Sequence, residues 1–158
     1  MIPFSVNRPM LKAMNLHEKR KIDFQLKKCI RTSHPESRSG ATITVKGLNP
    51  APSLVPGNPQ YYRVIVHLSI ISDFAYSENL REYAPLNKVN GSSAHAYSDY
   101  TPINTPLTVA LKAAFRDGTV LSETDTVLQC VGIEFYRRSG TDGYVPCFTG
   151  SMLVYDVF

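Results

Sequence analysis

Residues 61–71 read YYRVIVHLSII, and this stretch decides the fold. It is rich in β-branched and aromatic residues, which suit a pleated, half-buried surface. Side chains two positions apart in a strand share a face. One face is wholly apolar and must belong to the core; it consists of Tyr62, Val64, Val66, Leu68 and Ile70. The other face is mixed, which predicts a surface that is partly wetted or meets another surface; it consists of Tyr61, Arg63, Ile65, His67, Ser69 and Ile71.

The same alternation predicts further strands around this central one. Residues 107–115 also allow a helix. Their larger apolar residues alternate cleanly, however, and the segment is bounded by a proline before it and Asp117-Gly118 after it, which favours a strand. The other predicted strands cover residues 21–32, with a β-bulge at Lys27-Lys28, and residues 41–48, 92–100, 126–138 and 151–158. About seven or eight strands separated by turns predict an all-β protein, an antiparallel β-sandwich or jelly roll.

The domain organisation follows from the first residues, which show no clean period. Residues 1–10 carry two prolines and are predicted to form an extended arm, while residues 11–20 allow one or two helical turns. We therefore expect a basic N-terminal arm over residues 1–20 and one β-sandwich domain over residues 21–158.

Charge is distributed unevenly along the 158 residues, although the net charge is only +4. The part up to Lys46 contains ten basic and three acidic residues, a net charge of +7, which leaves −3 for the remainder. A cationic front on a mildly acidic body suits nucleic acid, an acidic surface or a neighbouring copy. The alternative is a solvated strand edge whose lysines discourage aggregation.

Motifs for catalysis and metal binding are missing from the sequence. No G-x-S-x-G or phosphate-binding glycine loop occurs, and the histidines, cysteines and carboxylates do not cluster at ligand spacing. The three cysteines form no C-x-x-C; Cys130 reads as a buried small hydrophobe, and whether it pairs with Cys147 stays open. Glu134 is expected to face solvent, and His67 to be structural. We expect no enzyme, no cofactor and no metal site.

The first residues, MIPFSVNRP, lack the charged and apolar regions of a secretory signal, and the apolar runs are far shorter than a membrane span. We expect a soluble protein that is made in the cytoplasm, or a mature chain whose leader was removed, with a virion as a candidate destination.

Short motifs in the second half of the chain occur in a recognisable order. Residues 72–74 read SDF, 84–87 read APLN, 130–136 read CVGIEFY, and YVP follows a polar hairpin at 144–146. This order resembles the C-terminal part of an uncharacterised β-sandwich protein family common in Bacteroidetes genomes, with its G-[VI]-[EQ]-F-[YF] strand, short hairpin, Y-P-L step and final strand. The likeness covers residues 20–158, but the chain departs from the pattern at Pro146-Cys147-Phe148 and lacks the longer N-terminal region. It implies a fold class and no catalytic residues.

Three groups of residues are candidates for contacts. The candidate nucleic-acid or partner contacts are Lys19, Arg20, Lys21, Lys27, Lys28 and Arg31; the arm contacts are Ile2, Phe4 and Val6; the aromatic patch is Tyr61, Tyr97 and Tyr100. The basic group contains one ring only, so it would bind nucleic acid non-specifically, through phosphates. The tyrosines suit an interface or sugar stacking, although they equally suit strand ends.

The leading functional hypothesis is a structural, non-enzymatic protein. We expect it to form a homo-oligomer or to dock on a larger particle, such as a virion or surface component, through its sandwich surface and arm. The alternative is a binding module for glycan or nucleic acid, which the salt dependence of binding would distinguish.

Overall fold

The computed structural model describes residues 1–12, 14, 16, 24–50, 57–141 and 143–158. The described elements are α1 (Arg8–Leu11), α2 (Phe24–Cys29), β1 (Ile30–Ser33), β2 (Gly40–Leu48), β3 (Tyr61–Ser72), β4 (Phe74–Ser77), β5 (Glu82–Pro85), β6 (Ser93–Tyr97), β7 (Thr101–Pro102), β8 (Leu107–Ala114), β9 (Asp125–Ser139) and β10 (Gly143–Val157). The all-β class is therefore confirmed. Ten strands form, more than the seven or eight expected, because β4, β5 and the two-residue β7 were not predicted.

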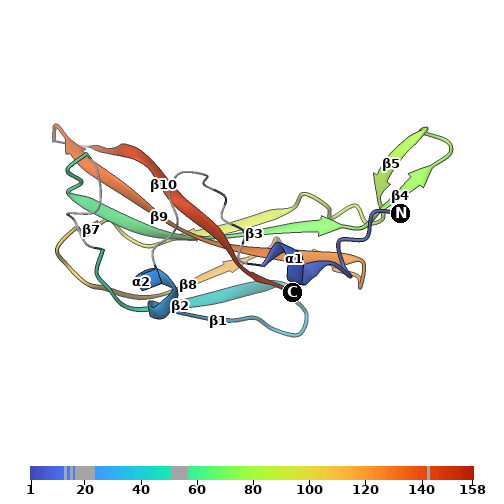
Figure 1. Cartoon of the computed structure of the whole chain (residues 1–158), viewed down its shortest axis with the longest axis horizontal. Helices are drawn as coiled ribbons and strands as arrows, with labels where there is room; N and C mark the ends of the chain where they lie inside the picture. The colour runs from blue at the N-terminus through green and yellow to red at the C-terminus, as the bar shows by residue number, and fades with distance from the viewer. Residues whose placement is uncertain (13, 15, 17–23, 51–56, 142) are drawn as a thin grey trace.

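Two antiparallel sheets make up the body (Figure 1). The large sheet has the order β10-β9-β3-β6, and β7 also pairs with β3. The small sheet has the order β1-β2-β8. Figure 1 shows the small sheet stacked along the large one, while the β4–β5 hairpin projects from one end of the molecule.

The predicted central strand is β3, and its two faces are as expected. Its apolar face, Tyr62 to Ile70 at alternate positions, is fully buried against Ile43 and Val45 of β2 and Val127 and Val131 of β9. Each aliphatic side chain buried in this way contributes about 1.5–3 kcal/mol to folding. The Tyr62 hydroxyl lies 2.9 Å from the Leu48 carbonyl oxygen and 2.8 Å from that of Thr105, and burial raises the pKa of Tyr62 to about 12.

The predicted strand over residues 21–32 is wrong for most of its length. Residues 24–29 form helix α2, and only Ile30–Ser33 pair with β2; residues 21–23 lie outside the described part. Leu26 of α2 and Ile30, the first residue of β1, are both buried, so the helix and the strand that follows it contribute to the same core. The apparent bulge at Lys27-Lys28 is therefore a helix that precedes a strand.

The prediction of an extended arm over residues 1–10 is wrong for its last residues, because helix α1 begins at Arg8, with Pro9 in its first turn. Its first contact is with the projecting hairpin. Ile2 and Phe74 exchange two backbone hydrogen bonds of 2.7 and 3.1 Å, and the Ser5 amide donates to Asp73 at 2.7 Å. Phe4 packs edge-on against the Phe74 ring. Ile2 and Phe4 thus contact the chain's own hairpin.

The arm continues along the edge strand β10. The Lys12 ammonium lies 2.9 Å from an Asp156 carboxylate oxygen. The Leu16 amide donates to the Met152 carbonyl at 2.9 Å, and the Val154 amide donates to the Met14 carbonyl at 2.8 Å. The arm therefore covers part of the otherwise unpaired edge of the large sheet.

Candidate functional site: a tyrosine cluster on the large sheet

The outer face of the large sheet, which turns away from the small sheet, gathers aromatic side chains at one end. Strand register explains this, because β3 and β9 are paired antiparallel with Tyr61 opposite Tyr136 and Arg63 opposite Glu134. Tyr97 of β6 lies opposite Ile65, on the same face. Residues that are opposite each other or diagonal on one face are within reach of long side chains.

Arg63 lies at the centre of this group. Its guanidinium carbon is 4.3 Å from the ring centre of Tyr97, 5.3 Å from that of Tyr100 and 5.2 Å from that of Tyr136. Its Nε donates to Glu134 Oε2 at 2.8 Å. Burial alone would lower the pKa of Arg63, but the hydrogen bond and charge of Glu134 outweigh it and raise the pKa.

Stacking between rings extends the group to the β9–β10 hairpin. Tyr100 and Tyr144 are stacked with ring centres 3.8 Å apart, and Tyr144 also packs edge-on against Tyr61 at 5.0 Å. Tyr136 is buried, and its hydroxyl donates to Glu134 Oε2. Burial is the largest cause of the raised pKa of Tyr136, and the hydrogen bond and charge of Glu134 raise this pKa further. We call Tyr61, Tyr97, Tyr100, Tyr136 and Tyr144, with Arg63 and Glu134, the tyrosine cluster.

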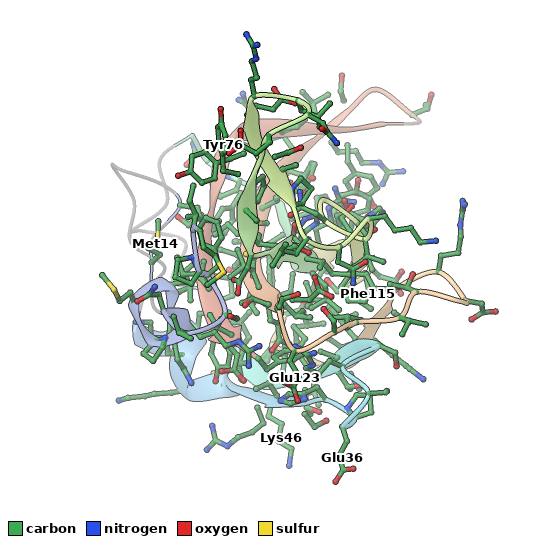
Figure 2. The ribbon with its side chains drawn as sticks, turned by 90° about the vertical axis from the view of Figure 1, so that its right-hand side faces the viewer. Met14, Glu36, Lys46, Tyr76, Phe115 and Glu123 are labelled. Atoms are coloured by element: carbon green, nitrogen blue, oxygen red, sulfur yellow. The ribbon has the colours of Figure 1, made fainter. Side chains whose placement is uncertain are left out.

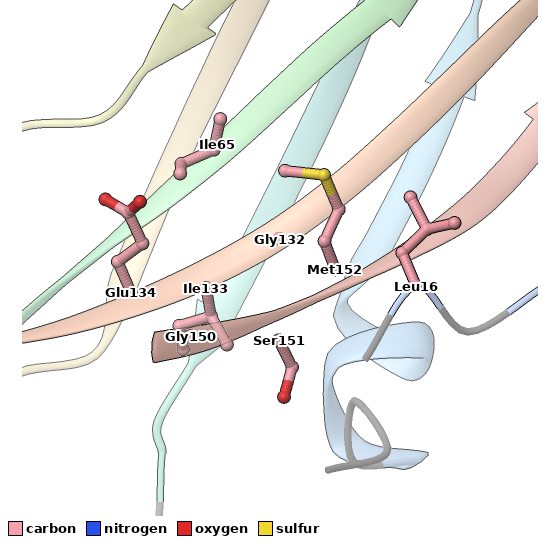
Figure 3. Close-up of a pocket in the computed structure, with 8 residues that line it drawn as sticks. All are labelled: Leu16, Ile65, Gly132, Ile133, Glu134, Gly150, Ser151 and Met152. Carbon is pink, nitrogen blue, oxygen red and sulfur yellow. The ribbon is translucent and has the colours of Figure 1, made fainter. Parts of the chain in front are cut away.

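An open pocket of about 260 Å³ adjoins the tyrosine cluster through Glu134 (Figure 3). Gly132 lines it between Ile65 and Met152 on the neighbouring strands, and Met152 packs closely on Gly132, since a Cβ added there would lie 3.2 Å from the Met152 methyl carbon. Figure 3 shows Met152 reaching over Gly132, with Leu16 of the arm at the far side. The volume is slightly below the range of about 300–1,000 Å³ typical of ligand pockets, so it suits one ring-sized group.

The predicted aromatic patch is thus one connected group: Tyr61, Tyr97 and Tyr100 are linked through Tyr144 and Arg63. The alternation had already placed Tyr61 and Arg63 on one face of their strand. Glu134 lies on the outer face, opposite the core face of β9, as expected, but only about one-third of its side chain is exposed, because Arg63 and Tyr136 contact it. Its partner Arg63 lies on a strand distant in the sequence, and no local signal gave that pairing.

The predicted basic group lies elsewhere. Lys27 and Lys28 are exposed on α2, and Arg31 is exposed on β1, at the small sheet; Lys19, Arg20 and Lys21 lie outside the described residues. Of the predicted arm contacts, Val6 is 72% exposed and Ile2 43%.

Histidine and cysteine side chains meet farther along the same outer face. His95, His67 and Cys130 are opposite one another on β6, β3 and β9. Burial and then the neighbouring His95 lower the pKa of His67, and burial raises that of the Cys130 thiol to about 11. Cys29, Cys130 and Cys147 are free thiols. In the described part of the chain, no group of three or more histidine, cysteine or carboxylate side chains is placed to hold a metal ion.

Neither the family models, nor the curated proteins, nor the solved structures contain a significant match to this chain. Within the described residues, no helix has the length and apolar character needed to cross a bilayer.

Proposed function

We propose that this chain is a non-enzymatic structural protein that self-assembles, or docks on a larger particle such as a virion or surface component, through its sandwich surface and N-terminal arm. The exposure of the arm's apolar side chains is the main observation that supports this proposal. The arm is held to the body by backbone and polar contacts, yet its large apolar side chains remain outside: Met1, Ile2, Val6, Met10, Met14 and Leu16 are 43–77% exposed.

The projecting hairpin adds to this apolar surface. Ile2 joins the arm directly to β4, and the hairpin residues Tyr76, Leu80, Tyr83 and Leu86 are each about half exposed or more. Figure 2 shows Tyr76 on the hairpin, on the opposite side of the molecule from Lys46. Exposed apolar side chains that gather at one place favour a protein interface, because covering them releases ordered water.

The oligomeric state tests the proposal. Size-exclusion chromatography with light scattering is expected to show an oligomer for the full chain and a smaller species after deletion of residues 1–10. A monomer at high concentration that is insensitive to salt and unchanged by this deletion contradicts the proposal.

A matched substitution separates the apolar side chains from the fold of the arm. Val6→Ser with Met10→Ser removes two exposed side chains and leaves the contacts of Ser5 and Arg8 in place. This variant is expected to weaken assembly. Val120→Ser is the control, since Val120 is 74% exposed but lies in the loop before β9.

A further inference from the structure

We propose that the tyrosine cluster and the pocket beside it form a carbohydrate site, in which one ring of a neutral sugar stacks on tyrosine and the next enters the pocket beside Glu134. This site adjoins the assembly surface proposed above at Leu16, which lines the pocket, while the tyrosine cluster itself is not part of that surface. It goes beyond that function, because it assigns a ligand class to a face that the arm leaves open.

The exposed rings are suited to stacking. Tyr97 is 44% exposed and Tyr144 39%, while Arg63, Tyr61 and Tyr100 hold them from behind. Because these rings are already ordered, a ligand would lose little side-chain entropy on binding. The less polar face of a pyranose presents C–H groups with partial positive charge, which match the negative face of an aromatic ring.

The polar centre is suited to hydroxyl groups. Both hydrogen bonds that Glu134 accepts in the described structure, from Arg63 and Tyr136, fall on Oε2. Oε1 is therefore available to accept a sugar hydroxyl, and Glu134 lines the pocket. A carboxylate that accepts from a hydroxyl makes a short, charge-assisted hydrogen bond, which would orient the sugar.

The charge at the centre favours a neutral ligand over a nucleic acid. Bases also stack on tyrosine, but single-stranded binding needs cations along the phosphates. Arg63 is already neutralised by Glu134 at 2.8 Å, and the remaining Glu134 oxygen would repel a phosphate. The predicted basic residues Lys27, Lys28 and Arg31 belong to α2 and β1, at the small sheet, whereas the cation that this face adds to Arg63 is Arg138, opposite Tyr144.

Saturation-transfer NMR with cellobiose, maltose, lactose and chitobiose tests the proposal on the full chain. At least one disaccharide is expected to receive saturation, and Tyr97→Ala with Tyr144→Ala is expected to weaken its binding about tenfold or more. Tyr76→Ala with Tyr83→Ala is the matched control, because these hairpin tyrosines are similarly exposed but lie outside the cluster.

A conservative variant and the melting temperatures show whether a loss of sugar binding comes from the missing rings or from unfolding. Tyr97→Phe keeps the ring and is expected to bind like the wild type, and the melting temperature of each variant shows whether it is folded. If the double variant is unfolded, the single Tyr97→Ala replaces it. Absence of saturation for all four sugars, sugar binding that survives loss of the rings, or salt-dependent binding of a single-stranded oligonucleotide that the ring substitutions abolish would overturn the proposal.

Discussion

At the scale of single residues, Asp125 is the most constrained carboxylate of the described chain. It is fully buried at the start of β9, and its oxygens accept hydrogen bonds from Asn87 Nδ2 at 2.7 Å, from the Ser122 amide at 2.7 Å and from the hydroxyls of Ser122 and Ser72. Its carbonyl oxygen accepts from Arg8 and Arg38. Asp125 thereby ties the arm and three loops to one end of the sandwich.

The contribution of Asp125 to the free energy of unfolding should therefore vary with pH. Burial opposes its charge, but the Ser122, Ser72 and Asn87 hydrogen bonds prevail and hold the pKa of Asp125 below its ordinary value. A lowered native pKa stabilises the fold above the unfolded pKa of about 3.9, and this contribution is lost as the pH falls through the native value. Asp125→Asn is expected to lower the free energy of unfolding by about 1–3 kcal/mol at pH 7.

Urea denaturation between pH 7 and pH 3 measures the free energy of unfolding of the wild type and of Asp125→Asn. The difference between these two free energies should become smaller towards pH 3, because Asp125 of the wild type begins to lose its charge. Glu123→Gln is the control, because Glu123 is an exposed neighbour (Figure 2) and should change stability by less than about 0.5 kcal/mol. A constant difference across the pH range would contradict the role given to the Asp125 charge.

At the scale of elements, alternation predicted those strands whose two faces differ. Leu111, Ala113 and Phe115 are buried, which confirms the strand interpretation of residues 107–115, and Val127 to Phe135 line the core as expected. The same rule failed for α2, because Phe24 and Leu26 fit a period of two in the sequence although the segment is helical. It also missed the β4–β5 hairpin, whose side chains are mostly half exposed and carry no strong pattern.

The candidate site shows the same limit. Sequence alone named Tyr61, Tyr97 and Tyr100 as a candidate aromatic patch, but it did not include Tyr136 and Tyr144, which the structure adds. It could not predict that Arg63 meets Glu134 or that Tyr100 stacks on Tyr144, since those contacts depend on which strands are neighbours. Register between strands far apart in the chain is set by the packed core as a whole.

Strand β10 provides a test of close packing at the element scale. A Cβ added at Gly150 would lie 2.0 Å from the Ile133 carbonyl oxygen of β9, where the pairing register shifts. Gly150→Ala is therefore expected to destabilise the protein by about 1–3 kcal/mol, because a backbone atom must move. Thermal unfolding measures it, and Gly143→Ala is the control, since its nearest atom would be 3.6 Å away. Equal effects of both substitutions would contradict the close approach.

At the scale of the whole molecule, stability is expected to be uneven. Strands β3 and β9 are paired along their full common length and contribute to one core, whereas β4 and β5 pair only with each other and with the bridge to Ile2 among the described residues. Elements with few buried contacts open at a low free-energy cost.

The rates of amide hydrogen exchange should therefore differ between the core strands and the projecting hairpin. Amides of β3 and β9 are expected to exchange only on global unfolding, and those of β4 and β5 much sooner. Phe4→Ala, which removes the edge-on contact with Phe74 at 6.2 Å between ring centres, should accelerate exchange in the hairpin alone. Hairpin amides as slow as those of β3 would show that the projecting part is folded cooperatively with the body.

The position of β3 in the chain has a consequence for biosynthesis. Its partners β6, β7 and β9 all come later in the sequence, so β3 leaves the ribosome before any strand that can pair with it. Until those strands emerge, its five-residue apolar face can pack only against the small-sheet strands that precede it in the chain, and the backbone edges of β3 stay unpaired, which exposes this strand to aggregation on crowded polysomes. Holding factors that bind extended apolar segments would act on this protein during translation, and they would lose their target once β9 emerges and pairs.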